Sequence, residues 1–340
     1  MNDRRDPGCE QTPPEIGGYF GFDLPCHPEL YPDAIRFQSG RAAIRAVIEG
    51  ASIRKMLLPA YVCDSVIKAV ADAGAAAEFY ALDEALYPKD LPHPLPEHSA
   101  VLYVDYFGLC RNNVRRLLGE NPGNSLIIDN SQALFAPHED VLATIYSPRK
   151  FAGVPDGGLL TTAPSLNVAV PEEEDRASLE RMRSLLLRMA YCAREGYADF
   201  QQIAVSLKDT TPLRMSRLTR RLMQSIAWEQ VGKKRRENFR AIAQKLDAIN
   251  DTQWTLGEQD VPMCYPLTLR GCAAKQIRDE LLARNIFVPV YWQDALPRVS
   301  AGTVEATLLY NTFFLPIDQR MERAQVESLG DLVLQLAGRG

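Results

Sequence analysis

Short apolar runs alternate with helical stretches between Ile35 and Thr162. An apolar run bounded by polar or turn residues predicts a buried strand, and apolar residues that recur every three or four positions predict a helix. The expected strands are 55–59, 77–81, 100–105, 125–129, 143–146 and 159–162, and the expected helices are 40–50 and 64–73. This alternation is typical of an α/β fold in which helices cover both faces of a mostly parallel sheet.

The pattern changes after residue 170. Residues 171–209 are charged and helical, and residues 214–249 form a long helical stretch rich in Arg and Lys. The elements expected after it are a strand at 264–269, a helix at 273–284, a strand at 286–291, an extended segment at 306–316 and a helix at 321–336. We therefore divide the chain into a flexible N-terminal arm (1–16), a large domain (17–240) and a small C-terminal α+β domain (241–340).

Composition narrows the class of protein. The 340 residues are 46% hydrophobic and 24% charged, which is ordinary for a globular chain, and the net charge of −5 gives no basic field that would favour nucleic acid. No apolar run is long enough to span a membrane, and the start lacks the apolar core of a secretory signal. The seven Cys form no CxxC pair and the four His are scattered, so neither a disulfide framework nor a metal site is expected. We expect a cytoplasmic protein.

Candidate chemistry lies directly after the predicted strands, where parallel sheets bind ligands. The strand 125–129 ends in Asp129. An Asp at a strand end is usually a turn or helix cap. A carboxylate at this edge can also keep a pyridinium nitrogen protonated, so that the ring acts as an electron sink. Gln132, three residues on, could then hydrogen-bond the phenolic oxygen of such a ring.

Lys150 follows the strand 143–146 within a loop that contains Ser147 and several glycines. A lone Lys is most often a solvated surface group. Glycines, however, let a backbone approach a ligand closely, and a lysine amine that burial has deprotonated is a nucleophile toward an aldehyde. Ser147 could hydrogen-bond a phosphate.

The first helix opens with Ser39, Gly40 and Arg41. The free N–H groups at a helix start make an anion site. A plain N-cap by Ser39 explains the same residues equally well on local grounds. A phosphate would add contacts from the amides of Gly40 and Arg41 and from the Arg41 side chain.

Taken in order, these segments resemble the DegT/DnrJ family of sugar aminotransferases, which are fold type I enzymes dependent on pyridoxal 5'-phosphate (PLP). The family's motifs are matched, from the first helix to the small domain, by Ser39-Gly40-Arg41-Ala42, Pro59-Ala-Tyr61, Val104-Asp-Tyr-Phe-Gly108, Ile128-Asp129-Asn-Ser-Gln132, Ser147 with Lys150 and Asp156-Gly157-Gly158, and Leu282–Ile286 with Val290-Tyr291-Trp292. None of these motifs is specific alone, and the resemblance rests on their order.

The resemblance implies a large PLP-binding domain with a mostly parallel, seven-stranded sheet and a small C-terminal α+β domain. It implies that Lys150 holds the cofactor as an imine and later moves protons, and that Asp129 pairs with the pyridine nitrogen. The other implied cofactor contacts are Ser39, Gly40, Arg41, Tyr61, Cys63, Gln132 and Ser147. The implied substrate contacts are Tyr19, Arg214, Tyr291 and Trp292.

Three departures distinguish this chain from the family. Only three positions separate Ser147 from Lys150, so the active-site loop is shorter than usual. Cys63 occupies the position where the family tends to have an aromatic residue for ring stacking. The family's Asn-Tyr-Arg segment, which reaches the phosphate of the neighbouring subunit, is matched by 212–214, which keeps Arg214 and loses the Asn.

The resemblance implies a homodimeric aminotransferase that moves an amino group from an amino acid such as glutamate to a nucleotide-linked keto sugar, in polysaccharide or modified-sugar biosynthesis. One alternative is a PLP-dependent dehydratase, but family members that dehydrate commonly replace the Lys by His. Another is a non-catalytic PLP-fold protein that binds a sugar nucleotide or a partner, which the short loop and Cys63 favour. A plain Rossmann nucleotide binder is disfavoured because no GxGxxG follows an early strand.

Overall fold

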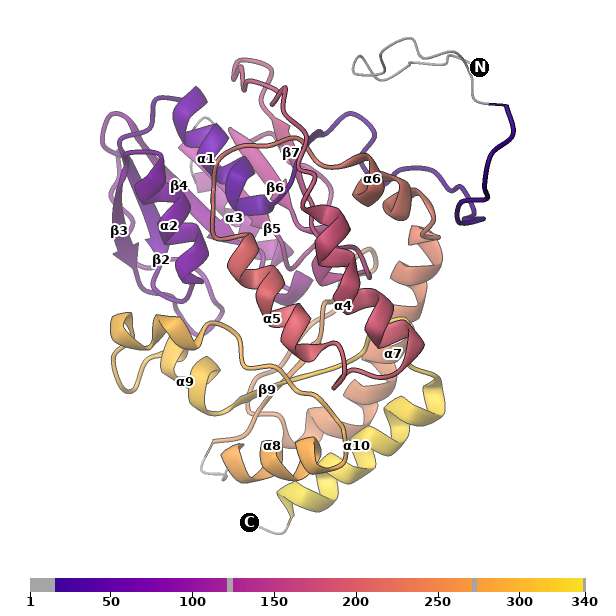
Figure 1. Ribbon diagram of the computed structural model, residues 1–340. Coiled ribbons are helices and arrows are strands. Elements are labelled where there is room, and N and C mark those ends of the chain that lie inside the picture. Colours follow the sequence, from indigo (N-terminus) through magenta and orange to yellow (C-terminus); the bar gives the residue numbers. More distant parts are fainter. Residues whose placement is uncertain (1–15, 121–124, 271–273, 339–340) are drawn as a thin grey trace.

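A seven-stranded sheet forms the centre of the large N-terminal part of the chain (Figure 1). The computed structural model describes residues 16–120, 125–270 and 274–338. The strands, in their order across the sheet, are β1 (Ile35–Phe37), β7 (Gly158–Thr162), β6 (Ala143–Tyr146), β5 (Leu126–Asn130), β4 (Ser99–Val104), β2 (Lys55–Pro59) and β3 (Ala76–Tyr80). Strand β7 is antiparallel to both neighbours, and the other neighbouring pairs are parallel. The predicted fold class is confirmed.

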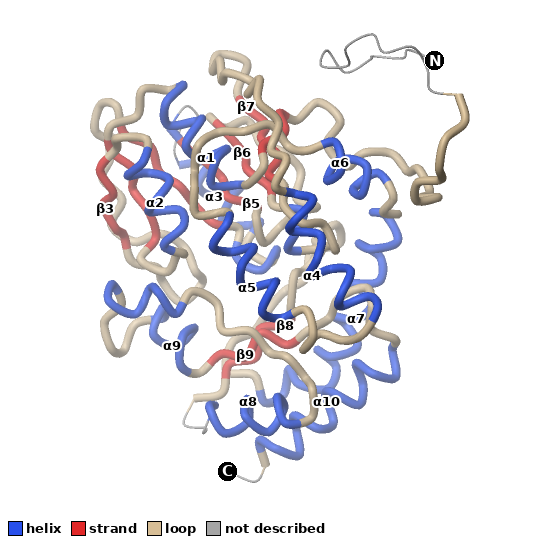
Figure 2. Tube along the Cα trace, in the orientation of Figure 1, coloured by secondary structure: helices blue, strands red, loops and turns tan. Residues whose placement is uncertain are grey.

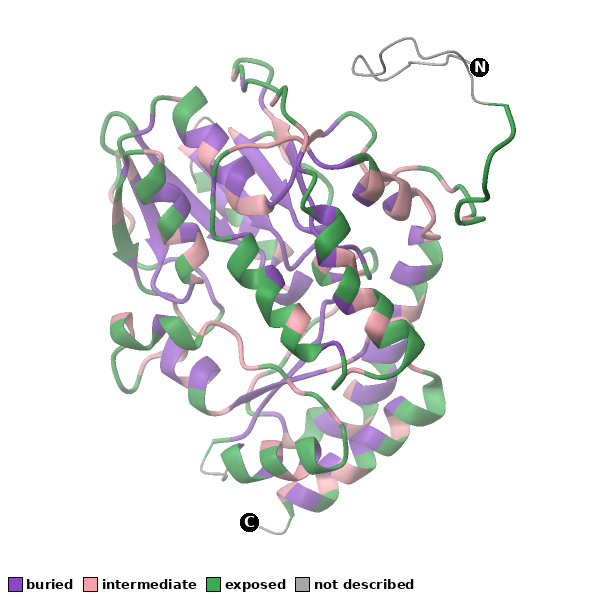
Figure 3. Ribbon diagram, in the orientation of Figure 1, coloured by how far each residue is buried: buried purple, intermediate pink, exposed green. Residues whose placement is uncertain are grey.

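The burial of each strand follows its sequence. Every residue of β4 and β5 is buried, as expected for continuous apolar runs in a sheet that is covered on both faces. The edge strand β3 exposes most of its residues. Figure 3 shows the central strands as a continuous buried layer beneath more exposed helices. The carboxyl ends of β4, β5 and β6 therefore meet at one well-anchored edge.

Helices surround this sheet (Figure 2). Helix α1 packs on β6 and β7. The helices of the large part are α1 (Gly40–Gly50), α2 (Asp64–Asp72), α3 (Arg111–Glu120), α4 (Ser178–Ala190), α5 (Tyr197–Ser206), α6 (Arg217–Gln224) and α7 (Trp228–Leu246). The helical stretch expected at 214–249 is thus two helices, separated at 225–227. Among the described residues, no helix is long and apolar enough to cross a membrane.

The C-terminal part has its own apolar core around a two-stranded antiparallel sheet of β8 (Tyr265–Thr268) and β9 (Thr312–Leu315). Its helices are α8 (Ala274–Ala283), α9 (Val304–Tyr310) and α10 (Arg323–Ala337). Helix α7 packs against α10, and its residues from Phe239 onward belong to this second core. The boundary that we expect between residues 240 and 241 falls inside α7 and stays a prediction, as does the arm 1–16, which lies outside the described residues except for Ile16.

One expected element of the C-terminal part is wrong, and a second is right only from β9 (Thr312–Leu315) onward. Residues 286–291 form no strand. Asn285 and Trp292, which flank this segment, have left-handed backbone angles, and Pro289 has no N–H to donate to a strand ladder. The segment expected to be extended at 306–316 instead begins with α9, because the Thr303 hydroxyl accepts from the Ala306 amide at 3.3 Å and caps a helix. Residue 273 of the helix expected at 273–284 lies outside the described residues.

Candidate cofactor site

The carboxyl edge of the sheet brings Asp129 and Lys150 into electrostatic contact. Asp129 lies near the end of β5, and Lys150 ends the short 3-10 helix Pro148–Lys150 that follows the neighbouring strand β6. The Lys150 side chain is accessible to solvent. Burial of its amine by the surrounding protein is nevertheless the largest cause that lowers the pKa of Lys150. Asp129 acts in the opposite direction and raises it. A lowered pKa increases the neutral amine, which is the form that attacks a carbonyl.

Two arginines add to the shift at Lys150. Arg149 and Arg41 both lower the pKa of Lys150 through charge repulsion. Burial in turn lowers the pKa of each arginine. Arg149 was not among the site residues predicted from the sequence, although it directly precedes Lys150. A concentration of positive charge beside a lysine favours a ligand that carries negative charge.

Gln132 presents an unsatisfied donor near Asp129. Asp129 is 5% exposed, and its carboxylate accepts from the Ser131 amide at 2.8 Å. The Gln132 Oε1 accepts from the Phe107 amide at 3.0 Å. Its Nε2 is buried and has no hydrogen-bond partner among the described residues. A buried donor without a partner is costly, so Gln132 fits a ligand that brings an acceptor oxygen.

The start of α1 forms the opposite side of the site. The Ser39 hydroxyl accepts from the Ala42 amide at 3.3 Å, so Ser39 is an N-cap. A Cβ on Gly158 would lie 2.3 Å from the Ser39 carbonyl carbon and 2.6 Å from the Gly40 nitrogen, so only glycine fits there. The Arg41 guanidinium donates to the Leu207 carbonyl at 2.7 Å. The helix start is thus packed closely against the turn at Gly157 and against β7. The N-terminus of a helix can bind an anion.

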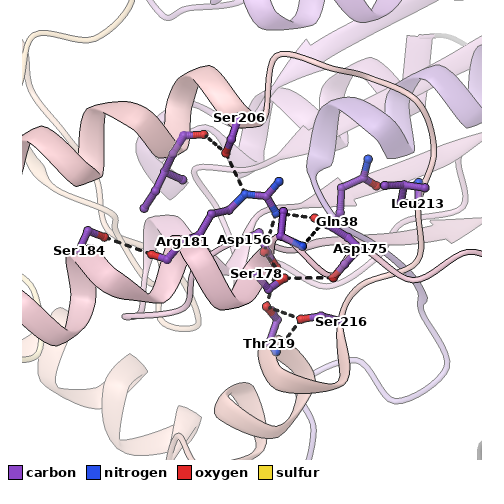
Figure 4. Close-up of polar contacts among 12 residues, drawn as sticks. Gln38, Asp156, Asp175, Ser178, Arg181, Ser184, Ser206, Leu213, Ser216 and Thr219 are labelled. Carbon is purple, nitrogen blue, oxygen red and sulfur yellow. Dashed lines mark hydrogen bonds and ion pairs between the residues drawn. The ribbon is translucent and has the colours of Figure 1, made fainter.

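A buried ionic network lies next to the turn that packs on this helix start (Figure 4). Asp156, which is fully buried, accepts from Ser178, Thr219 and Arg181. Arg181 also bonds Asp175. Burial is the largest cause that raises the pKa of Asp156, and its three donors oppose the shift. Because Asp156 directly precedes Gly157, the network fixes the turn that packs on α1.

Gln38 ties the same helix start to the segment before α6. The Gln38 amide donates to the Leu213 carbonyl, and the Gln38 carbonyl accepts from the Gly157 amide. The Gln38 side chain accepts from the Leu213 amide and donates to the Thr211 carbonyl. This arrangement keeps the 211–214 segment beside β1.

An aromatic cluster borders Lys150 on the side of the C-terminal part. The Lys150 amine lies 6.0 Å from the ring centre of Trp292. Trp292 contacts Tyr61 edge-on, with ring centres 4.7 Å apart, and also contacts Tyr106 at 5.9 Å. Cys63 is half-buried and its thiol lies 2.8 Å from the Ser65 hydroxyl. Residue 63 therefore contributes a thiol, and Trp292 contributes an aromatic ring near the Lys150 amine.

Arg298 anchors the segment that contains Trp292 to the large N-terminal part of the chain. Its guanidinium donates to the carbonyls of Ala60 and Val62 and to the Asp64 carboxylate. The Asp64 amide donates to the Asp294 carboxylate at 2.6 Å. We call residues 291–298 the latch segment. Its contacts hold Trp292 over the site and were not predicted from the sequence, because they join residues more than 200 positions apart.

The other predicted substrate contacts, Tyr19, Arg214 and Tyr291, stay predictions, and the structure gives the surroundings of each. Tyr19 is 98% exposed. Arg214 forms a bridge with Phe37 and lies 4.0 Å from the Glu174 carboxylate. The Tyr291 ring packs against Phe107 and Phe314, toward the core. Ser147 is buried, and its carbonyl accepts from the Lys150 amide at 3.2 Å.

The fold is shared with solved aminotransferases and with a PLP-containing dehydratase. No family model and no curated protein matches this sequence. Solved structures do match it. A DegT/DnrJ/EryC1/StrS aminotransferase from Brucella abortus is 16% identical, with 90% of this chain and 86% of that chain covered and a TM-score of 0.62.

Two further structures show the range of the fold. DesV of S. venezuelae, in complex with a ketimine intermediate, is 19% identical, with 90% and 85% of the two chains covered and a TM-score of 0.59. The E. coli GDP-4-keto-6-deoxy-D-mannose-3-dehydratase, with bound hydrated PLP, is 17% identical, with 88% and 87% covered and a TM-score of 0.57. At these identities the likeness establishes the fold, which both an aminotransferase and a dehydratase use.

Proposed function

We propose that this protein is a PLP-dependent aminotransferase that moves an amino group from an amino acid such as glutamate to a nucleotide-linked keto sugar. The observation that carries the proposal is the placement of Asp129 near the end of β5 and of Lys150 directly after the neighbouring parallel strand β6. The buried Gln132 Nε2, which has no hydrogen-bond partner among the described residues, and the N-terminus of α1 support the proposal. Structures of similar fold include an aminotransferase and a protein with bound PLP.

Each residue has a distinct task in this proposal. PLP, when bound, supplies an aldehyde and a ring that withdraws electrons. The neutral Lys150 amine would hold the aldehyde carbon of the cofactor. The Lys150 Nζ would also accept and donate a proton at the substrate carbon. Asp129 would keep the ring nitrogen protonated, and the amides of Gly40 and Arg41, with Ser147, would bind the phosphate.

A dehydratase is the rival within the same fold. The identity of residue 150 favours transamination, because family members that dehydrate commonly have His there. The two reactions also leave different products. Transamination exchanges a keto oxygen for an amine and converts the donor into a keto acid, whereas dehydration removes water from the sugar.

We further propose a homodimer that resides in the cytoplasm. The N-terminal segment exposes large apolar side chains, namely Ile16, Tyr19, Phe20 and Phe22, with exposed fractions of 76–98%. Helices α4 and α5 also expose apolar side chains, including Leu179, Met189 and Phe200. A second copy would remove such surfaces from water. The described cysteines are free, which suits a reducing compartment.

The direct test is a half-reaction with glutamate. The protein is loaded with PLP, freed of excess cofactor and mixed with glutamate, and 2-oxoglutarate is measured against the amount of bound cofactor. We expect about one equivalent, followed by turnover when a nucleotide-linked keto sugar is added. Lys150→Ala should give none, and Lys150→Arg, which keeps the charge without a comparable nucleophile, should also give none. A loaded protein that forms no keto acid but removes water from the sugar would be a dehydratase.

A further inference from the structure

The turn between β4 and α3 is unusual in its backbone. Phe107 has a left-handed conformation with φ of 61°, and Gly108 follows with φ of 70°. A bulky residue such as Phe rarely adopts this region, so the surroundings must hold it there. Both residues are buried. The turn matches one of the ordered motifs in the sequence, but sequence analysis gave it no task.

This turn determines which way the Gln132 amide faces. The Phe107 N–H can only donate, and it lies 3.0 Å from Gln132 Oε1. A flipped amide would place the Gln132 NH₂ group against that N–H, so two donors would face each other. The backbone therefore fixes Oε1 toward Phe107 and leaves Nε2 as the group without a partner among the described residues.

Several contacts hold the turn in place. The Phe107 carbonyl accepts from the Met263 amide at 2.8 Å, and the Asp105 carboxylate accepts from the Cys110 amide at 2.9 Å. The Asp105 amide donates to the Asp129 carbonyl at 3.2 Å, which ties the turn to the end of β5.

The turn has no space for a side chain at position 108. A Cβ on Gly108 would lie 2.7 Å from the Val261 carbonyl oxygen and 3.2 Å from the Gln132 carbonyl oxygen. Both obstacles are backbone atoms, which cannot rotate away as a flexible side chain can. The turn is therefore seated between Gln132 and the 261–263 segment.

We propose that the left-handed turn at Phe107–Gly108 is a positioning device that orients Gln132, so that Nε2 donates to an anionic oxygen on the bound ring. Phe107 acts through its backbone N–H and touches neither cofactor nor substrate. The inference rests on the proposed function and adds a residue to its site. A donor that faces this oxygen stabilises its anionic form, so loss of the correct orientation makes that form harder to reach.

The first test needs no cofactor. Hydrogen exchange at the Phe107 amide is measured in the PLP-free protein and in Gln132→Leu, which removes the acceptor. We expect the exchange of this amide to become at least about tenfold faster, the effect of one lost hydrogen bond, while β4 and β5 stay protected. Unchanged exchange would overturn the positioning contact, whatever the protein binds.

The second test uses the PLP-loaded protein and compares Gly108→Ala with Gly74→Ala. Both glycines have positive φ, of 70° and 76°, but a Cβ on Gly74 meets no atom within 4 Å. The two variants therefore share the backbone strain, and only Gly108→Ala should displace the turn. Gln132→Glu is a milder variant, since its carboxylate still accepts from Phe107 but no longer donates to the ring.

The readout is the pH midpoint of the visible absorption of the bound cofactor. We expect Gly108→Ala and Gln132→Glu to raise the midpoint by about one pH unit, and Gly74→Ala to leave it unchanged. Equal midpoints for Gly108→Ala and Gly74→Ala in coloured proteins would overturn the proposal. A wild-type protein that stays colourless with PLP would instead overturn the proposed function, and the role of the Gln132 donor with it.

Discussion

The two sides of the candidate site differ in how they are built. The sheet side carries Asp129 near the end of β5, and Gln132 and Lys150 shortly after the buried strands β5 and β6, so short-range chain geometry brings them together. The other side is the latch segment, which contains no strand and is held by Arg298 and by contacts across more than 200 positions. The first side therefore depends on local chain geometry, and the second depends on long-range contacts.

The largest effect should come from breaking the sheet side at Gly158. In Gly158→Ala, the new Cβ would meet the backbone of Ser39 and Gly40 at 2.3–2.6 Å. We expect the start of α1 to move and the affinity for PLP to fall by about 100-fold or more, since overpacking of this kind costs about 1–3 kcal/mol or more. Equilibrium titration with PLP measures this. Gly153→Ala, whose Cβ meets no atom within 4 Å, is the matched control, and equal affinities of the two variants would contradict the prediction.

A smaller and more selective effect should come from releasing the latch segment. Arg298 is 15% exposed and bonds three acceptors on the large domain. We expect Arg298→Ala to lower the free energy of unfolding by about 2 kcal/mol and to raise the KM for the acceptor, while cofactor affinity falls less than it does in Trp292→Leu. Urea unfolding and steady-state kinetics measure the two effects. Arg298→Lys keeps the charge and should lose less. Equal losses in cofactor and acceptor binding would show that the two sides are not separable.

The variant Trp292→Leu tests whether the latch segment supplies an aromatic ring to the cofactor site, since Cys63 has no ring. Trp292→Leu keeps an apolar side chain but loses the edge contact with Tyr61. We expect cofactor affinity to fall by roughly tenfold, in line with about 0.5–1.5 kcal/mol for an aromatic contact. The double variant Cys63→Phe with Trp292→Leu should recover part of this loss. No change in PLP titration for Trp292→Leu would leave Trp292 as a packing residue.

The smallest effect concerns Asp105, at the base of the turn that orients Gln132. Burial is the largest cause that raises the pKa of Asp105 to about 7, with Asp260 and Glu139 adding to it and Arg111 opposing it. Since this pKa is above the usual value, the stability that the protonated form provides is full at acid pH and is lost as pH rises through about 7.

Asp105→Asn removes this titration and keeps an acceptor for the Cys110 amide. Relative to wild type, the variant should therefore be more stable at pH 8 than at pH 5, by about 1 kcal/mol or more. Urea unfolding at the two pH values measures the difference. The same relative stability at both would mean that Asp105 titrates normally.

The sequence predicts the sheet side well, because strand ends, Gly pairs and the residues after them follow from local pattern. Lys150, Asp129 and the Ser39 cap all lie at the predicted sheet edge. It does not predict the Phe107 turn, since a left-handed Phe contradicts local preference and is held by Val261 and Met263 from far along the chain. The wrong strand at 286–291 has a partly local origin. Asn285 is left-handed at the end of α8, where the Ile286 amide donates to the Leu281 carbonyl at 2.9 Å.

The measurement that tests the central claim most directly is covalent trapping at Lys150. Purified protein is incubated with PLP, reduced with borohydride, digested and analysed by mass spectrometry, beside Lys150→Ala. The account predicts a visible absorption band that reduction removes, and one pyridoxyl group on the peptide that contains Lys150, with neither in the variant. A protein that stays colourless with PLP, or a label spread over surface lysines and equal in Lys150→Ala, would contradict it.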